Sequence, residues 1–483
     1  MMKSLVIVAA ACAVLAMARP VHAQPKADAD PRIEKLLASI SEERLQQLLE
    51  KLVSFGTRNT LSDPNNPTRG IGAARQWILD EMKRSSPRLQ VSFDTHQIAQ
   101  QGRITHDVEL RNVVAILPGR TPRRIYVTGH YDTLNLGRGG QLSGNTRTRG
   151  TTRPTAAATP GAATPAAVSE GQSRPAQNTD PQRRPDFDHN VDAPGANDDG
   201  SGTALTMELA RVFGQSGIDF DATLVFMCVA GEEQGLIGSR AHVQTIAAEN
   251  VDVVADFNND IVGNSHGGNG IINQETLRIY SEGPEDSASR ALARFVRRVA
   301  AAYVPSHHIE LMARRDRFGR GSDHSSFNAH GYPAIVFREA NENFSKQHSA
   351  NDTLDGVDVT YLAQNARVNA AGLASLALAP PAPQVTSERG RPMLGRRPSG
   401  YDANLQWAAS PGAVAYRIYW RQAWTPDWQH SQVVGNVTEY VLPNVNIDDY
   451  VFGVAAIGAD GHESVVSAYV APDRRDEDVK LVK

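Results

Sequence analysis

Histidine and carboxylate residues recur in five short motifs of this sequence, mostly after stretches with the composition of buried strands. The first motif is Gly-His-Tyr-Asp at residues 129–132. Because His130 and Asp132 are two positions apart, their side chains point to the same side of an extended chain. A histidine placed in this way can bind a metal ion while a nearby carboxylate orients its imidazole. An ordinary polar surface histidine is the alternative interpretation.

Two further motifs combine carboxylates with glycines. Residues 193–202 contain Asp198 and Asp199 just before a helical stretch. One interpretation is that these residues form a turn and cap the helix. The other is that one of the carboxylates bridges two cations. Glu232 and Glu233 follow an apolar run, and adjacent carboxylates repel one another unless a cation lies nearby. One of the two can ligate a metal while the other acts as a general base toward water that the metal polarises.

The last two motifs add another carboxylate and two histidines. Asp260 lies in Asn-Asn-Asp-Ile-Val-Gly, where a polar turn and a metal ligand are equally good interpretations. His348 lies in His-Ser-Ala-Asn-Asp-Thr and His324 in Gly-Ser-Asp-His-Ser-Ser-Phe, and spacing alone does not choose between them. Two histidines and three carboxylates make a ligand set for two cations. Mixed nitrogen and oxygen ligands without thiolate suit Zn²⁺, although Co²⁺ or Mn²⁺ would also fit.

Strand-like and helical patterns alternate through the region that carries these motifs. Near-continuous apolar strands between helices predict an α/β fold, with a largely parallel sheet covered on both faces. Sites in such sheets lie beyond the carboxyl ends of strands. The predicted strands are 112–117, 125–128, 224–230, 251–255 and 333–337. The predicted helices are 31–53 with a break near Ser41, 71–82, 202–213, 238–248, 287–302 and 359–378.

Two other regions depart from this pattern. Residues 138–190 are rich in Thr, Ala, Pro and Gly with few large apolar residues, so we predict a disordered insertion in a surface loop. Residues 379–397 form a predicted linker rich in Pro, Arg and Gly. Residues 398–473 alternate strands with turns, which is typical of a β-sandwich. This last region, with Trp407 in an early strand, resembles a fibronectin type III module.

Composition and the N-terminal residues limit the classes of protein to which this chain can belong. The chain has 483 residues, 41% hydrophobic and 21% charged, with a net charge of −4. These values exclude collagen-like and wholly disordered proteins, and they provide no basic field for nucleic acid. Residues 1–23 are typical of a cleaved signal peptide, because Lys3 precedes an apolar run too short for a bilayer and a small-residue cleavage site follows. We therefore expect an exported, soluble protein, periplasmic or extracellular, without a membrane span.

The order of the motifs resembles that of a known family. His-x-Asp, Asn-Asp-Asp-Gly-Ser-Gly, Gly-Glu-Glu, Asn-Asp-Ile-Val-Gly, Ser-Asp-His-Ser-Ser-Phe and His-Ser-x-x-Asp-Thr follow one another as in the di-zinc exopeptidases of metallopeptidase clan MH. That group includes secreted leucyl-type aminopeptidases, glutamate carboxypeptidases and glutaminyl cyclases. The similarity covers residues 31–378 apart from the insertion, and it implies a mixed sheet between helices with two bound zinc ions.

The resemblance also implies a role for each candidate residue. Glu232 becomes the general base and Asp132 the support of His130. His324 lies near the site without being a zinc ligand, and the peptide bond after Asp198 is a candidate for the cis form. The implied zinc ligands are His130 and Asp260 on one ion, Glu233 and His348 on the other, and Asp198 as the bridge between them.

These features together predict an exopeptidase that acts on peptides or proteins with a free terminus, in the first place an aminopeptidase. A carboxypeptidase is the alternative, because it needs cations for a terminal carboxylate. A different class is a non-catalytic binding protein that acts through the C-terminal sandwich, for which we expect a polymer or surface partner. The cations that such a carboxypeptidase could use lie just before the Ser-Asp-His motif, although a role as ordinary surface charge is favoured for them. They are Arg314, Arg315, Arg317 and Arg320.

Overall fold

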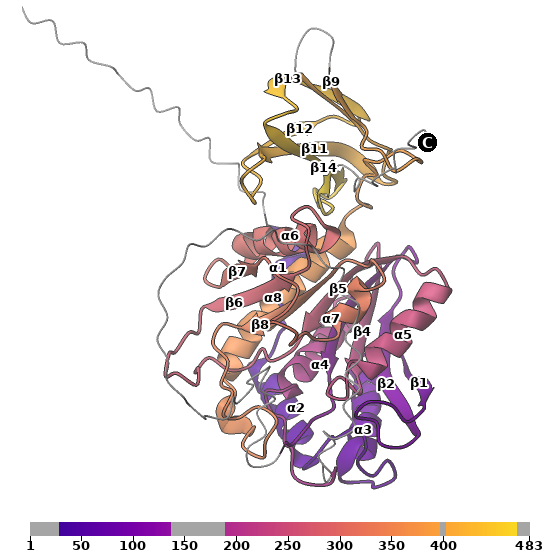
Figure 1. Ribbon diagram of the computed structural model, residues 1–483, viewed down its shortest axis with the longest axis vertical. Helices are drawn as coiled ribbons and strands as arrows, with labels where there is room; N and C mark the ends of the chain where they lie inside the picture. The colour runs from indigo at the N-terminus through magenta and orange to yellow at the C-terminus, as the bar shows by residue number, and fades with distance from the viewer. Residues whose placement is uncertain (1–28, 137–188, 397–401, 471–483) are drawn as a thin grey trace, which may run out of the picture.

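A computed structural model of the chain describes residues 29–136, 189–396 and 402–470 (Figure 1). An α/β unit carries a smaller β unit at one end. The predicted signal peptide at 1–23 lies outside the described residues, as does all but the end of the predicted insertion at 138–190. Within the described ranges, none of the helices combines the length and apolar character that a membrane crossing requires.

A mixed sheet of eight strands forms the centre of the α/β unit, in the order β1-β2-β4-β3-β5-β8-β6-β7. Strands β4, β3, β5 and β8 run parallel to one another, whereas β1, β2 and β6 pair antiparallel with neighbours. The prediction of an α/β fold with a mixed, largely parallel sheet is therefore confirmed. The strands are β1 (Gln90–Ile98), β2 (Val108–Leu117), β3 (Arg124–His130), β4 (Thr223–Val229), β5 (Val253–Asn259), β6 (Thr276–Ser281), β7 (His308–Met312) and β8 (Ala334–Glu339).

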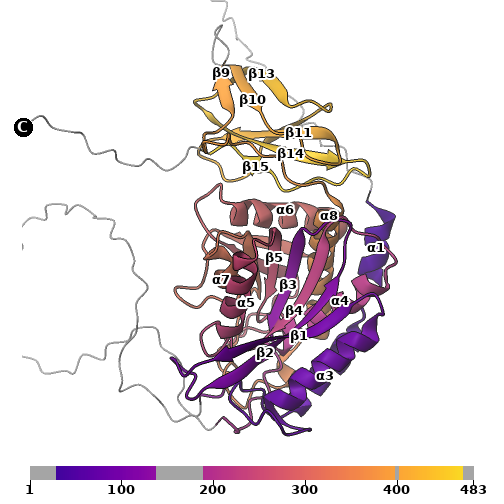
Figure 2. The same ribbon diagram turned by 90° about the vertical axis from the view of Figure 1, so that its right-hand side faces the viewer.

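Helices cover both faces of this sheet, as the two perpendicular views show (Figures 1 and 2). The helices are α1 (Pro31–Ala38), α2 (Glu42–Ser54), α3 (Gly70–Ser85), α4 (Gly200–Gln215), α5 (Ile237–Ala248), α6 (Ala288–Tyr303), α7 (His324–Asn328) and α8 (Val359–Leu378). Helices α5 and α7 pack on one face, and the other six form the larger layer on the opposite face. Helix α8 is almost entirely buried, which explains its Ala- and Leu-rich sequence.

A close approach of backbones brings α4 to the end of β3. A Cβ atom at Gly129 would lie 2.6 Å from the carbonyl carbon of Gly202, and one at Gly202 would lie 2.2 Å from the carbonyl oxygen of Asn259, so neither position tolerates a side chain without displacement. The two glycines therefore let the first turn of α4 lie directly against His130, the last residue of β3.

Two antiparallel sheets form the C-terminal unit, in the orders β13-β10-β9 and β12-β11-β14-β15. They share a separate hydrophobic core around Trp407, Tyr416, Ile418 and Phe452. The prediction of a C-terminal unit built from β-strands is confirmed, and its sheets are antiparallel. Strand β9 lies inside the stretch that we expected to be linker, because its backbone pairs with β10. The strands are β9 (Leu394–Arg396), β10 (Asp402–Gln406), β11 (Ala413–Gln422), β12 (His430–Val434), β13 (Glu439–Asn446), β14 (Tyr450–Gly458) and β15 (Ser467–Ala468).

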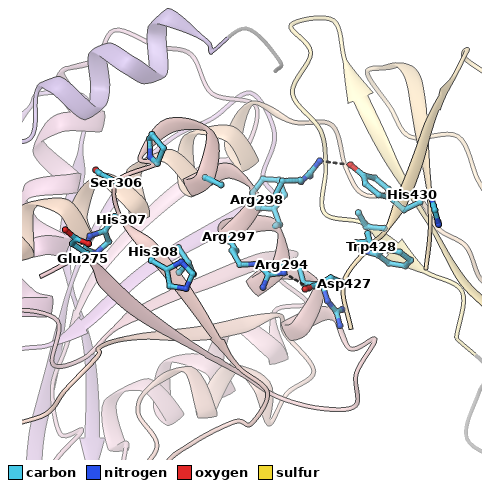
Figure 3. A pocket seen from close by; sticks show the side chains of 17 residues that line it. Glu275, Arg294, Arg297, Arg298, Ser306, His307, His308, Asp427, Trp428 and His430 are labelled. Carbon is cyan, nitrogen blue, oxygen red and sulfur yellow. Dashed lines mark hydrogen bonds and ion pairs between the residues drawn. The ribbon is translucent and has the colours of Figure 1, made fainter. Parts of the chain in front are cut away.

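Charged side chains join the two units. Arg421 of β11 donates to Asp286, which lies just before α6, at 2.7 and 2.9 Å. A groove of about 660 Å³ runs beside this contact, between α6 and the β unit. Figure 3 shows Arg298 of α6 on one side of the groove, with Trp428 and His430 on the other. Charged contacts therefore link the units, while apolar side chains such as Phe295 and Val466 also line the groove between them.

Candidate metal centre

The five predicted ligands come together at the carboxyl ends of the central strands. His130 ends β3, Asp260 follows β5 directly, and Glu233 lies in the turn after β4. Asp198 lies just before α4, and His348 lies in the loop between β8 and α8. All five are buried except His348, whose side chain is 27% exposed. Segments far apart in the sequence thus converge at one edge of the sheet.

Asp198 lies between the two histidines. Its Oδ1 is 3.4 Å from His130 Nε2, and its Oδ2 is 3.1 Å from His348 Nε2. His130 Nε2 also lies 3.8 Å from Asp260 Oδ1, and His348 Nε2 lies 3.2 Å from Glu233 Oε1. Each histidine therefore faces one oxygen of the shared carboxylate and one further carboxylate.

The five residues form two groups of three that share Asp198. In each group, His130–Asp198–Asp260 and Asp198–Glu233–His348, the candidate ligand atoms lie within 4.8 Å of one another. Glu233 Oε1 is buried and has His348 Nε2 as its neighbour at 3.2 Å, and a buried carboxylate in such a position is stabilised by a cation. Imidazole nitrogen and carboxylate oxygen in three-residue groups are ligands that zinc accepts. The residues present fit two zinc ions.

Asp132 supports the site mainly through the turn that follows β4. Its carboxylate accepts hydrogen bonds from the backbone N–H groups of Glu232 and Glu233, both at 3.2 Å. His130 Nδ1 lies 3.1 Å from the backbone carbonyl of Asp132 and 3.7 Å from its carboxylate. A donor role for Nδ1 in this contact leaves Nε2 unprotonated in the neutral ring and free to bind metal.

Two other carboxylates fix the segment that carries Asp198. Asp199 caps α4 and also accepts the backbone N–H of His130 at 3.0 Å and of Ile261 at 3.2 Å. Asp352, from the motif that contains His348, accepts the backbone N–H of Asp198 at 2.9 Å. The peptide bond between Asp198 and Asp199 is cis, as the resemblance implies. These contacts hold four of the five motifs in one arrangement.

Burial and crowding of carboxylates govern the protonation of the site. Burial alone would lower the pKa of His130, but the carboxylates around it raise that pKa well above its usual value. His348 follows the same pattern, with Glu233 and Asp198 raising its pKa. Burial, reinforced by the charges of Asp260 and Glu233, raises the pKa of Glu232 well above its usual value. The negative charge of the site thus attracts cations, whether protons or metal ions.

Two buried residues near the site had not been identified from the sequence. Arg58 donates to the backbone carbonyls of Tyr131, Pro194 and Gly195 at 2.6, 2.6 and 2.8 Å. The charge of Asp323 contributes to the raised pKa of Glu232. Burial raises the pKa of Asp323 itself to about 7. Asp323 could have been recognised because it lies in the Ser-Asp-His motif, whereas Arg58 lies in no motif that would indicate its role.

His324 lies outside the groups of candidate ligands. Its Nε2 pairs with the backbone carbonyl of Arg315 at 2.8 Å, and burial lowers the pKa of this imidazole to about 4. The structure therefore brings His348 to the other candidate ligands and leaves His324 neutral beside them.

Comparison with known proteins identifies the relatives of this chain. A model of peptidase family M28 matches residues 186–373. A probable zinc metalloprotease of Pyricularia oryzae is 34% identical over 476 residues, which cover 90% of this chain and 84% of the relative. Another, of Leptosphaeria maculans, is 33% identical over 470 residues, covering 90% and 96%.

Solved structures of Legionella pneumophila proteins share the fold. The LapA aminopeptidase matches with a TM-score of 0.50 at 19% identity, over 72% of this chain and 74% of that one. LapB matches with a TM-score of 0.51 at 19% identity, over 74% and 78%. The family match and the identity to the two metalloproteases over nine-tenths of the sequence show that the chain belongs to peptidase family M28 and is a zinc metallopeptidase.

Proposed function

We propose that this zinc metallopeptidase is an exopeptidase with two zinc ions, and in the first place an aminopeptidase. The observation that carries the proposal is the position of Asp198, whose two oxygens face two separate groups of ligands. Glu232 lies next to both groups, and its side chain is only partly buried. The excess of carboxylates suits a substrate whose terminal amine is positively charged.

The catalytic roles follow from the side chains around this site. Zinc ions held by the five ligands would polarise a water molecule and the carbonyl of the scissile bond. Glu232 takes a proton from the attacking water and returns it to the amine that leaves. In the metal-free chain burial raises the pKa of Glu232, and a carboxyl group that holds its proton more tightly is a better acceptor for the proton of the attacking water. Asp132 holds the backbone of Glu232 in place.

Amine release from a panel of aminoacyl-p-nitroanilides tests the proposal. We expect release that a chelator abolishes and zinc restores, with two zinc ions bound per chain. Glu232→Gln is expected to lower kcat by roughly 100- to 10,000-fold while zinc content stays unchanged. Activity that persists in Glu232→Gln would refute the assignment of the general base. One zinc per chain in the fully active enzyme would refute the two-ion site.

We further propose that residues 1–23 are a signal peptide that directs export and is then cleaved, and that the C-terminal unit is a fibronectin type III-like module. The second proposal is supported by the arrangement of the described strands in sheets of three and four around one core. Pull-down with the full chain and with a chain ending at residue 378 tests whether the unit binds a polymer or surface partner.

A further inference from the structure

Three arginines lie together beside the candidate metal centre, and we call them the arginine cluster: Arg338 at the end of β8, with Arg317 and Arg320 from the loop between β7 and α7. Arg338 Nη2 donates to Asp260 Oδ2. The other oxygen of Asp260, Oδ1, faces His130 Nε2 at 3.8 Å. The guanidinium of Arg338 is therefore separated from the proposed zinc position by the width of one carboxylate.

Arg338 retains a donor that the fold does not use. Its side chain is 3% exposed, and its Nη1 finds no hydrogen-bond acceptor among the described residues. The charged groups that act on it most strongly are Asp260, Glu342, Asp198 and Glu232. Because a buried guanidinium N–H without a partner is costly, this donor points to an acceptor that arrives with the substrate.

The cluster also carries an excess of positive charge. Arg317 Nη1 donates to Glu342 Oε1, and Arg320 Nη2 donates to Glu342 Oε2 at 3.0 Å. One carboxylate thus serves two arginines, while Asp260, the partner of Arg338, is a candidate zinc ligand. Arg320 also lies over the ring of Phe344 at 4.5 Å, which helps to hold it in place.

The rest of the arginine run is oriented differently. Arg314 stacks on Phe318, a ring that is 90% exposed, with 3.6 Å between guanidinium carbon and ring centroid. Arg315 is 67% exposed and pairs with the adjacent Asp316 at 3.3 Å. The surface-charge interpretation therefore applies to these two arginines, whereas Arg317 lies inward, with only 14% of its side chain exposed.

We propose that the arginine cluster binds a carboxylate of the substrate next to the scissile bond, and that this peptidase accordingly prefers substrates with a negative charge there. The proposal rests on the exopeptidase function proposed above. Guanidinium groups suit this task because they present paired donors that match the two oxygens of a carboxylate. Two kinds of substrate supply such a group: an acidic N-terminal side chain and the free α-carboxylate of a C-terminal residue.

Isosteric substrates separate charge from shape. We would compare kcat/KM for glutamyl-, glutaminyl- and leucyl-p-nitroanilide, and for N-acetylated dipeptides with and without C-terminal amidation. We expect a preference of about 10-fold or more for glutamyl over glutaminyl substrate, or for free over amidated dipeptide. The first result identifies an acidic side chain as the ligand, and the second identifies the α-carboxylate.

Variants test whether the arginine cluster causes the preference for charged substrates. Arg338→Gln and Arg317→Gln are expected to reduce the ratio of charged to neutral substrate toward 1, mainly through KM, and Arg338→Lys to restore part of it. Arg315→Gln is the matched control, because the side chain of Arg315 is 67% exposed and pairs with its neighbour Asp316, and this variant should keep the full ratio. Zinc content and calorimetric binding of N-acetylglutamate to each zinc-loaded variant supply readouts that do not depend on turnover.

The outcomes distinguish this proposal from the one on which it rests. Hydrolysis of leucyl and glutaminyl substrates without any preference for charge would leave the exopeptidase standing and overturn the role of the cluster. Equal losses for charged and neutral substrates in Arg338→Gln, together with lost zinc, would also overturn it, since Arg338 would then only support Asp260. If no substrate is hydrolysed, the exopeptidase proposal fails, and the calorimetry still decides whether the cluster binds a carboxylate.

Discussion

Asp198 is the residue through which the two halves of the site affect one another. Its carboxylate is buried, which by itself would raise its pKa, but His348 and His130 bring that pKa well below the usual value. The same interactions raise the pKa of each histidine. Between Asp198 and the two histidines, protons therefore rest on the imidazoles, whose nitrogens are the atoms that zinc must bind.

The first prediction concerns this competition between protons and zinc. Because the pKa values of His130 and His348 lie above 6.5, both imidazoles are protonated at pH 7 in the metal-free chain. Zinc binding should release these protons, and zinc affinity should rise by up to about 10-fold per pH unit for each proton displaced. Calorimetric titration of the metal-free protein in two buffers with different ionisation enthalpies counts the protons.

His324→Gln provides the control for this experiment. Burial lowers the pKa of His324 to about 4, so it is neutral at pH 7, and its loss should leave the number of released protons unchanged. Zinc binding without proton release at pH 7 would contradict the assignment of His130 and His348 as ligands.

At the scale of elements, the central strands could be predicted because they are buried on both faces and their sequences are continuous apolar runs. Strands β1 and β7 lie at the two edges of the sheet, where polar residues alternate with apolar ones, and no prediction included them. Strand β6, next to the edge, was missed for the same reason. The pattern of hydrophobicity thus indicated that a sheet lies between layers of helices, but it did not indicate how many strands the sheet has.

The residues of the site likewise fall into those that could be predicted from the sequence and those that could not. The candidate ligands were visible because each lies in a short motif, and their roles as zinc ligands stay predictions. Arg58 and Arg338 carry no local signal, because their partners lie far away in the sequence: Arg58 contacts the carbonyl of Tyr131, 73 positions on. Residues that join motifs to one another are recognised only when the chain is folded.

The second prediction concerns Arg58, which ties the end of α2 to two loops of the metal centre. Its guanidinium is fully buried and donates to four backbone carbonyls, one of them Leu52 within α2. Lysine cannot reach all four acceptors, so Arg58→Lys should lower the free energy of unfolding by roughly 2–4 kcal/mol. Urea unfolding of the metal-free protein measures the loss.

Arg84→Lys is the control for the same charge-preserving change on a surface. Arg84 is 61% exposed and pairs with Glu81 within α3, so its replacement should cost less than about 1 kcal/mol. Similar losses in the two variants would show that Arg58 contributes nothing beyond an ordinary surface arginine.

At the scale of the whole molecule, the two units have separate apolar cores, and charged groups are among the contacts that link them. Glu463 of the β unit is one of these groups, and its side chain is 12% exposed. It accepts hydrogen bonds from Arg298 of α6, from Arg417 Nε at 2.6 Å and from Tyr419 Oη at 2.7 Å. One carboxylate from the β unit thus joins an arginine of the α/β unit to two side chains of β11.

The third prediction follows from the charge of Glu463. Burial would raise its pKa, but Arg298 and Arg417 bring the pKa below its ordinary value of 4.5. Its ionised form therefore stabilises the folded chain above pH 4.5, and that contribution disappears as the pH falls through the lower pKa of the folded state. Glu463→Gln should lower the free energy of unfolding by about 1–3 kcal/mol at neutral pH and by much less near pH ~3.

Thermal unfolding of the full chain at both pH values measures this difference. Glu388→Gln, which changes an exposed carboxylate of the same region, should shift stability by less than about 0.5 kcal/mol at either pH. An equal loss for Glu463→Gln at both pH values would mean that the shape of the side chain, rather than its charge, matters at the contact. A loss confined to neutral pH would show that the ionised carboxylate of Glu463, paired with Arg298 and Arg417, stabilises the folded chain.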